Sequence, residues 1–262
     1  MKDKMFDLAE KVVLVTGGTG LLGKEFCETL SDYGANVIVV DLNESDCKKQ
    51  AESLAKKYGT KAIGVKADIT NRNEVAKMVS EVVKKLGKVD VLVNNAAGKS
   101  KNFYAKFEDY PLEDWEKVMS VNLTGAFLCA QAVGKQMAKQ NSGSIINISS
   151  VYGIKAPDQR IYKGTKINTP AVYSASKAGL IGLTTYLATY WADKNIRVNC
   201  ISPGGVFNNQ ENEFVKKYSE KTPLGRMANK NELSGAVLFL ASDASSYVTG
   251  HNLVVDGGLT IW

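Results

Sequence analysis

The strongest constraint on the fold is an alternation of short aliphatic runs with helical patterns that extends along the whole chain. The runs predict seven β-strands, at residues 11–16, 36–40, 62–66, 89–95, 144–149, 196–202 and 252–256. Strands that alternate with helices pair in parallel, and a parallel sheet needs helices on both of its faces. We therefore expect an α/β fold built on a doubly wound, seven-stranded parallel sheet.

The segments between these runs predict the covering helices. One apolar stripe at helical spacing lies between the third and fourth runs and comprises Val75, Met78, Val79, Val82, Val83 and Leu86. Two longer helices are predicted at 112–140 and 171–193. Residues 151–172 and 204–230 have no usable period, so we expect substrate loops over the carboxyl edge of the sheet, with a short helix near 211–219 in the second.

The composition excludes several classes of protein. The 262 residues include 33 Lys and Arg against 27 Asp and Glu, a net charge of +6 without a dense basic run, so we expect a small anionic molecule and no nucleic acid as partner. Four separated cysteines and one histidine predict no metal site. The aliphatic runs are too short to span a membrane and the start lacks a signal stretch, so we expect a cytoplasmic protein. No linker interrupts residues 1–262, which favours a single domain.

A glycine-rich turn follows the first predicted strand. Gly18, Gly20 and Gly23 form the pattern G-x-G-x-x-G where a helix is expected to begin, which lets backbone N–H groups approach a pyrophosphate. Asp41 ends the second strand, where a carboxylate can bind adenosine ribose hydroxyls. The same carboxylate would repel the 2′-phosphate of NADP, so NAD is expected over NADP. The alternative is that Asp41 is only a turn residue.

A tyrosine and a lysine are spaced four residues apart at Tyr173 and Lys177, which places them on one face of a helix. Lowering a tyrosine pKa by about 3 units requires roughly 4 kcal/mol, which a unit charge ~4 Å away can supply at an effective dielectric of ~20. Tyr162 and Lys166 have the same spacing, but Gly164 makes a helix there improbable. We therefore expect Tyr173 to be the acid–base residue and Tyr162 to lie in a substrate loop.

In this order, the motifs resemble those of the short-chain dehydrogenase/reductase family over essentially the whole chain. The resemblance is carried by TGGTGLLG (16–23), Asp68-Ile69, NNAAG (94–98), VNLTG (121–125), INISS (146–150), YSASK (173–177), RVNCISPGGV (197–206) and VDGG (255–258). It implies a Rossmann fold, a nicotinamide dinucleotide cofactor, oxidoreductase activity on CH–OH groups and a homotetramer built on the two long helices.

By position, the resemblance implies four catalytic roles. Ser150 would hydrogen-bond the substrate oxygen, and Tyr173 would exchange the hydroxyl proton. Lys177 would lower the pKa of Tyr173 and bind the nicotinamide ribose, while Asn122 would hold a water that links Lys177 to solvent. The implied cofactor contacts are Gly17, Thr19, Gly20, Leu21, Leu22, Gly23, Asp41, Leu42, Asp68, Ile69, Asn95, Ala96, Ala97, Gly98, Tyr173, Lys177, Pro203, Gly204 and Val206. Taken singly, many of these residues also fit as ordinary caps or turn formers.

The chain departs from the family pattern at three places. Its glycine spacing is that of the longer sugar-nucleotide branch, about ten extra residues separate Ser150 from Tyr173, and Asn208 replaces the usual threonine. A weaker resemblance, to dehydrogenases of bacterial surface-sugar and flagellin-glycan pathways, rests on residues 168–200, SPGGVFNNQ and DGGLTIW. It implies that basic residues, Lys99, Lys101, Arg160, Lys163 and Lys166, face the substrate side and attract an anionic substrate. The substrate contacts that we expect are Tyr162, Lys163 and Asn208.

The sequence thus predicts NAD-dependent interconversion of a secondary alcohol and a ketone, on a sugar, a polyol or a sugar phosphate. Three alternatives remain open at this point. They are a sugar epimerase that reduces and reoxidises its NAD within one cycle, a 3-ketoacyl reductase, which Asp41 disfavours, and a catalytically silent regulator that senses the dinucleotide.

Overall fold

The computed structural model describes residues 4–262, and its centre is one seven-stranded sheet. The strands are β1 (Val12–Thr16), β2 (Asn36–Asp41), β3 (Ala62–Lys66), β4 (Val91–Asn94), β5 (Gly143–Ile148), β6 (Ile196–Pro203) and β7 (Asn252–Val255). Their order in the sheet is β3-β2-β1-β4-β5-β6-β7, and every neighbouring pair is parallel. This confirms the expected doubly wound sheet, in which the order reverses between β1 and β4.

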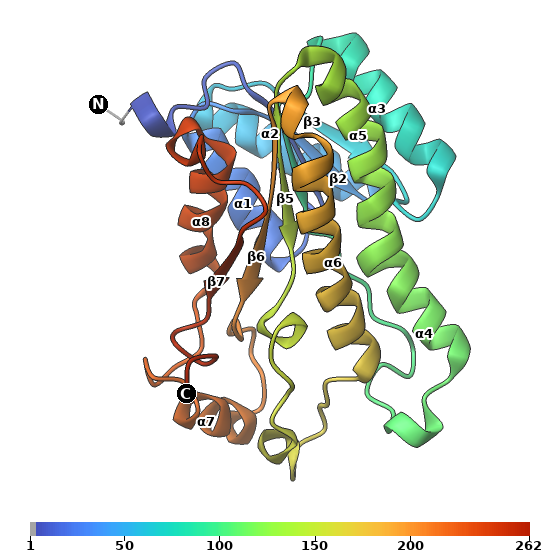
Figure 1. Ribbon diagram of the computed structural model, residues 1–262, viewed down its shortest axis with the longest axis vertical. Helices are drawn as coiled ribbons and strands as arrows, with labels where there is room; N and C mark the ends of the chain where they lie inside the picture. The colour runs from blue at the N-terminus through green and yellow to red at the C-terminus, as the bar shows by residue number, and fades with distance from the viewer. Residues whose placement is uncertain (1–3) are drawn as a thin grey trace.

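Helices cover both faces of the sheet (Figure 1). One face packs against α1 (Leu21–Asp32), α2 (Glu44–Tyr58) and α8 (Ser234–Ala241). The other face packs against α3 (Arg72–Leu86), α5 (Ala126–Gln140) and α6 (Ala171–Tyr190). Two further helices, α4 (Leu112–Met119) and α7 (Asn212–Glu220), lie beyond the carboxyl ends of the strands.

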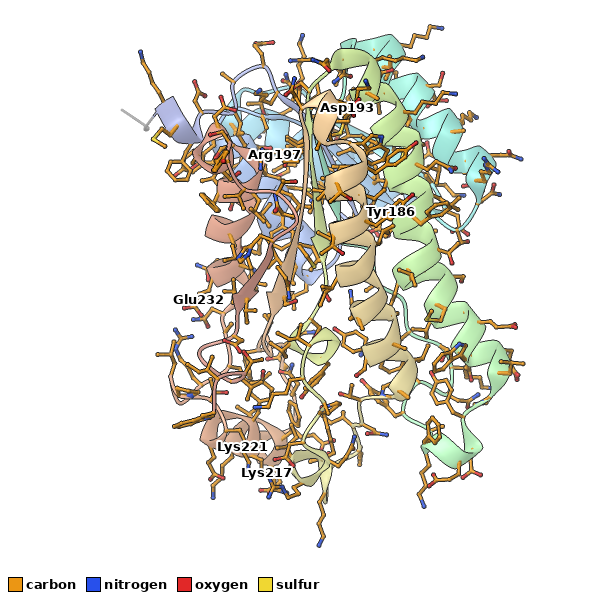
Figure 2. All side chains as sticks on the ribbon, in the orientation of Figure 1. Tyr186, Asp193, Arg197, Lys217, Lys221 and Glu232 are labelled. Atoms are coloured by element: carbon orange, nitrogen blue, oxygen red, sulfur yellow. The ribbon has the colours of Figure 1, made fainter. Side chains whose placement is uncertain are left out.

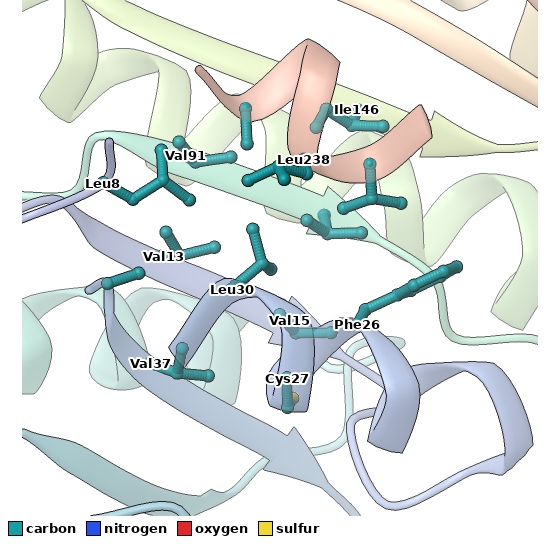
Figure 3. Close-up of a cluster of buried hydrophobic side chains, with 14 of the residues drawn as sticks. Leu8, Val13, Val15, Phe26, Cys27, Leu30, Val37, Val91, Ile146 and Leu238 are labelled. Atoms are coloured by element: carbon teal, nitrogen blue, oxygen red, sulfur yellow. The ribbon is translucent and has the colours of Figure 1, made fainter. Parts of the chain in front are cut away.

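The strands read as continuous apolar runs because both of their faces are buried. In β1, Val13 and Val15 belong to the cluster that packs on α1 and α8, and Leu14 belongs to the cluster on the opposite face. Figure 3 shows Val13 and Val15 beside Phe26 and Leu30 of α1. Burying each such side chain contributes roughly 1.5–3 kcal/mol, so the central strands hold both helix layers.

Polar caps fix where the helices begin and end. The side chain of Asn71 accepts hydrogen bonds from the N–H groups of Asn73 and Glu74, which starts α3 three residues before its first apolar position. Gly87 ends the helix in the left-handed region with φ of 80°. In the same way, the side chain of Asn43 caps α2 by accepting from the N–H of Asp46.

The helical stretch predicted at 112–140 is not uniform. Between α4 and α5 the chain forms a π-helical turn at Ser120–Gly125, where Gly125 packs against Ile69 with no space for a β-carbon. π-turns inside helices are frequent at functional sites, and this one carries Asn122. The prediction of one regular helix was wrong here because the spacing of apolar residues in the sequence does not reveal the extra residue of a π-turn.

The two predicted substrate loops are largely confirmed as irregular. The first contains two 3-10 turns, at Val151–Gly153 and Gln159–Tyr162, and gives way to α6 at Ala171. The second contains α7, close to its predicted position. Across residues 4–262, no helix combines the length and the apolar character needed to cross a membrane.

Candidate active site

A cavity of about 490 Å³ opens at the carboxyl edge of the sheet. It is bounded by the first turn of α1, the loops after β4, β5 and β6, and the helices α6 and α7. Its lining includes Ser150, Tyr173 and Lys177, which the sequence analysis expected to act together. Parallel strands direct their carboxyl ends to the same edge, which explains why residues far apart in the chain meet here.

Ser150 and Tyr173 line the same cavity, where the serine hydroxyl favours the charged form of Tyr173. Ser150 follows β5 in an extended conformation, and its hydroxyl also accepts the N–H of Tyr152 at 3.1 Å. Burial raises the pKa of Tyr173, and the effect of the Ser150 hydroxyl offsets this only in part. The phenol is therefore protonated at neutral pH in this arrangement, and it can donate a proton to an oxygen bound between the two hydroxyls.

Lys177 lies one helical turn after Tyr173, with its Nζ 5.7 Å from the centre of the tyrosine ring. The ammonium is buried and donates a hydrogen bond of 2.7 Å to the carbonyl of Ile148. Burial lowers the pKa of Lys177 to about 8. In this arrangement the ammonium is directed at Ile148 and desolvation dominates at the tyrosine, so the role of Lys177 in lowering the pKa of Tyr173 stays a prediction.

Asn122 connects the loop after β4 to the start of α6. Its Oδ1 accepts the N–H of Gly98 at 2.8 Å, and its Nδ2 donates to the hydroxyl of Ser176 at 3.2 Å. That hydroxyl donates in turn to the carbonyl of Tyr173 at 2.9 Å. The amide of Asn122 therefore braces the backbone beside Tyr173, and its role in holding a water stays a prediction.

The turn after β1 is shaped to admit a phosphate group. Gly17 has φ of 62°, and a β-carbon at Gly23 would overlap the carbonyl oxygen of Gly17, so the turn and α1 pack backbone to backbone. α1 begins at Leu21 with Gly20 as its N-cap, and no side chain caps it. The N–H groups of its first turn are thus available to an anion, which fits the pyrophosphate of a dinucleotide.

Asp41 is held against this turn. Its Oδ2 accepts the N–H of Thr19 at 3.1 Å and the hydroxyl of Thr19 at 2.6 Å, while Oδ1 accepts the N–H of Leu42 at 2.8 Å. The carboxylate retains free lone pairs for ribose hydroxyls. Lys66 of β3 lies in register with Asp41, a cation that the sequence reasoning did not place here.

The remaining expected cofactor residues form the rest of this edge. Asn95 donates from Nδ2 to the carbonyls of Thr16 and Gly17, which fixes the glycine turn, and a β-carbon at Gly17 would lie 2.8 Å from Cα of Ala96. Asp68 accepts the N–H and hydroxyl of Thr70, so its side chain is engaged locally. The expected residues that line the cavity itself are Leu22, Asn95, Ala97, Pro203, Gly204 and Val206.

The structure separates the expected substrate residues into two groups. Tyr162 and Asn208 line the cavity, whereas Lys163 is exposed and does not. Lys217 donates to the backbone carbonyl of Lys163 at 2.6 Å, and Figure 2 shows Lys217 on α7 at this end of the molecule. Because Lys163 follows the 3-10 turn that orients Tyr162, the two side chains point to different surroundings.

Tyr162 is fixed by its own neighbours. Its hydroxyl donates to that of Tyr152 at 2.9 Å and shares a hydrogen bond of 2.6 Å with Thr169. Its ring stacks on Phe214 of α7, with 5.6 Å between the ring centres. The helix that would pair Tyr162 with Lys166 is absent from the described loop, as expected, so the two do not share a helical face.

Sequence reasoning did not identify the aromatic wall of the cavity. This wall consists of Phe103, Tyr104, Tyr152, Phe214 and Tyr218. Phe103 packs edge-on against Tyr173, with 6.4 Å between the ring centres, and the hydroxyl of Tyr218 accepts the N–H of Gly205. These aromatic residues come from the loop after β4, the turn after β5 and α7, and no single period in the sequence connects the three segments.

Comparison with known proteins identifies the class of this site. A family model described as enoyl-(acyl carrier protein) reductase matches residues 20–260. The chain is 36% identical to an NAD-dependent glycerol dehydrogenase from Listeria innocua, over 99% of this chain and 97% of the relative. It is 37% identical to a 3-oxoacyl-[acyl-carrier-protein] reductase, FabG, from Aquifex aeolicus, over 96% and 98% of the two chains.

The fold comparison agrees with these matches. The crystal structure of a gluconate 5-dehydrogenase from Burkholderia cenocepacia, in complex with NADP and tartrate, superimposes with a TM-score of 0.90. The two chains are 32% identical, and 98% of each is covered. Nearly the whole chain therefore has a counterpart in sequence and in structure.

Proposed function

The chain belongs to the short-chain dehydrogenase/reductase family of oxidoreductases that act on CH–OH groups, and on that premise we propose that it interconverts a secondary alcohol and a ketone of a sugar, a polyol or a sugar phosphate. The observation that carries this proposal is that Ser150, Tyr173 and Lys177 line one cavity, with Lys177 one helical turn after Tyr173. We infer that residues 1–262 act as one domain, in which the loops at 151–172 and 204–230 receive the substrate.

The protein supplies position and acid–base chemistry. When bound, an oxidised nicotinamide would supply the hydride acceptor and a positive charge. Ser150 would hold the substrate oxygen, and Tyr173, as phenolate, would take the hydroxyl proton from it. A nearby positive charge favours the phenolate, so Tyr173 would be activated on cofactor binding and not before. Lys177, released from Ile148, would bind the ribose, and Asn122 would keep α6 in place.

We propose NAD as the preferred cofactor. Support comes from the Asp41 carboxylate at the end of β2, held by Thr19 beside the turn that would bind the pyrophosphate. A 2′-phosphate would meet this negative charge. The relatives differ in their named cofactors, since the Listeria enzyme is NAD-dependent and the Burkholderia structure contains NADP. The cofactor preference of this chain is therefore argued from its own residues: the negative charge of Asp41 disfavours NADP, and the positive charge of Lys66 beside it opposes that effect.

A 3-ketoacyl reductase is the second candidate, and the likeness to the Aquifex enzyme favours it. An acyl chain carried on a protein needs an open, apolar approach to the reacting carbon. The two candidates are separated by nicotinamide absorbance with NAD and NADP, using alcohols and ketones of polyols against a 3-ketoacyl thioester. Turnover of polyols with NAD supports the proposal, whereas a preference for the thioester with NADPH contradicts it. If the protein binds NAD but turns over neither polyols nor the thioester, the remaining alternatives are the epimerase and the catalytically silent regulator.

We also propose a homotetramer. Phe127 of α5 and Tyr186 and Tyr190 of α6 are large aromatic residues that lie exposed on one face of these helices. The rings of Tyr186 and Tyr190 stack on each other, with 5.9 Å between their centres. An exposed apolar face of this kind favours association between copies of the chain. The mass of the purified protein by light scattering tests this, and the mass of a monomer would refute it.

A further inference from the structure

The cavity beside Tyr173 carries positive charge and no negative charge. Its lining contains two ammonium groups, Lys99 and Lys177, and neither Asp nor Glu. Lys177 is buried, and it is engaged by the carbonyl of Ile148. Lys99 is therefore the cation that remains for a ligand in the part of the cavity away from the sheet.

Lys99 is positioned by aromatic residues and not by an acid. Its Nζ donates to the hydroxyl of Tyr104 at 2.9 Å and lies 5.3 Å from the centre of that ring. It also lies 5.5 Å from the ring centre of Phe103. None of the ion pairs formed within residues 4–262 involves Lys99. Cation–π contacts thus orient the ammonium of Lys99, and no carboxylate within residues 4–262 forms an ion pair with it.

Phe103 connects this cation to the candidate catalytic residue. Its ring packs edge-on against Tyr173, with 6.4 Å between the centres, and the Nζ of Lys99 lies over the same ring. A molecule of a few carbons can therefore reach Lys99 at one end while a carbon near its other end lies beside Tyr173. Lys101, two residues further along, does not line the cavity, although it carries the same charge.

We propose that Lys99 binds a negatively charged group of the substrate, so that the substrate is an anionic polyol with its carboxylate or phosphate distal to the reacting carbon. This inference rests on the proposed function and narrows it. The remaining polar groups of the lining are neutral, and two of them are engaged within the protein, since the Tyr152 hydroxyl accepts from Tyr162 and that of Tyr218 accepts from Gly205. The wall thus offers the substrate few groups other than the ammonium of Lys99 as a strong, charged contact.

The test compares Lys99→Met with Lys101→Met on three substrates of one carbon skeleton: sorbitol, gluconate and sorbitol phosphate. Both variants remove one charge from the same short segment, so any general electrostatic attraction is matched between them. We expect Lys99→Met to lower kcat/KM about tenfold on the better anionic substrate, the loss typical of one charge-assisted hydrogen bond. The loss should appear as a higher KM with kcat unchanged, because the contact exists before and during the reaction.

The outcomes separate the two claims. The inference is supported if Lys99→Met leaves the turnover of sorbitol unchanged and Lys101→Met has normal kcat/KM on all three substrates. The anionic substrate that the unmodified enzyme turns over better then identifies the bound group as a carboxylate or a phosphate. Equal effects of the two substitutions, or a raised KM for NAD instead of the substrate, would refute it. Efficient turnover of sorbitol alone by the unmodified enzyme would refute it while the proposed function stands. No turnover of any of the three would count against both.

Discussion

The ammonium of Lys177 stands 5.7 Å from the centre of the Tyr173 ring, yet its hydrogen bond goes to the carbonyl of Ile148. Burial shifts the pKa of both side chains: it raises that of Tyr173 and lowers that of Lys177 to about 8. Burial thus disfavours the charged form of each group. A site of this kind needs an added positive charge to form a phenolate, which ties acid–base chemistry to cofactor binding.

Tyr173→Phe should reduce turnover by about 10²–10⁴-fold, the usual contribution of a positioned acid–base group. Tyr162→Phe should cost far less, because that hydroxyl is bonded to Tyr152 and Thr169 instead of to Ser150. The measurement is kcat on the same alcohol for both variants, with NAD binding followed by fluorescence as the control for folding. Equal losses in the two variants would reject the assignment of Tyr173.

Asp41→Asn should shift the cofactor preference toward NADP by about tenfold, since it removes a charge beside the expected 2′-phosphate. The amide oxygen can still accept both hydrogen bonds from Thr19, and only the bond from the N–H of Leu42 is lost, so the turn should largely keep its shape. Asp46→Asn is the matched control, because Asp46 is exposed on α2. The ratio of kcat/KM for NAD to that for NADP decides the matter, and an unchanged ratio would mean that Asp41 is only a turn residue.

Gly23→Ala should destabilise the protein by roughly 1–3 kcal/mol and weaken dinucleotide binding, because the new methyl group overlaps the Gly17 carbonyl. Backbone atoms cannot rotate away as a side chain can. Gly235→Ala offers a control, since a β-carbon there meets nothing within 4 Å, and alanine should stabilise α8 by up to about 1 kcal/mol. Denaturation midpoints with and without NAD measure both effects. A Gly23→Ala protein with normal stability and NAD affinity would contradict this packing account.

Alkaline pH should destabilise the protein through its buried thiols. Burial alone raises the pKa of Cys129 from 9.0 to about 12, and burial also raises those of Cys47 and Cys200 to about 11. A raised folded pKa means that stability is complete below pH 9 and falls as pH rises toward the folded value. The lowered pKa of Lys177 makes stability rise with pH between about pH 8 and pH 10.5, but this single group opposes several thiols.

For Cys129, the loss approaches about 1.4 kcal/mol per pH unit above 9. Urea midpoints of reduced protein at about pH 8 and about pH 10 should therefore differ less in Cys129→Ala than in the unmodified chain. Identical pH dependence in the two proteins would show that this thiol is not shielded in the folded state.

Much of the fold follows from the sequence because the central strands are buried on both faces. The runs at 11–16 and 36–40 become β1 and β2 with nearly the predicted bounds, because a two-sided sheet is what buries so many consecutive aliphatic residues. Asn71 and Gly87 show why helix ends were less certain: caps are single polar residues without a period. The π-turn around Asn122 was invisible for a similar reason, because it depends on the contact between Gly125 and Ile69.

The site was predictable where a motif sets the geometry and not where distant segments meet. Tyr173 and Lys177 share a helix, so their relation follows from spacing alone. The aromatic wall depends on Phe103, from the loop after β4, and Phe214, from α7, and no local pattern predicts such a meeting. The sequence also shows that Lys163 is charged, but it does not show where the side chain points, because that direction depends on the preceding 3-10 turn.

The most direct test of the account follows the hydrogen itself. The purified enzyme is incubated with NAD and a polyol or sugar acid that carries deuterium on its carbinol carbons, and the NADH formed is analysed by mass spectrometry. We predict that deuterium appears in NADH as the ketone accumulates, and that Tyr173→Phe abolishes both. Deuterium that returns to the sugar at a carbon of inverted configuration, or the absence of any transfer while NAD is bound, would contradict the account.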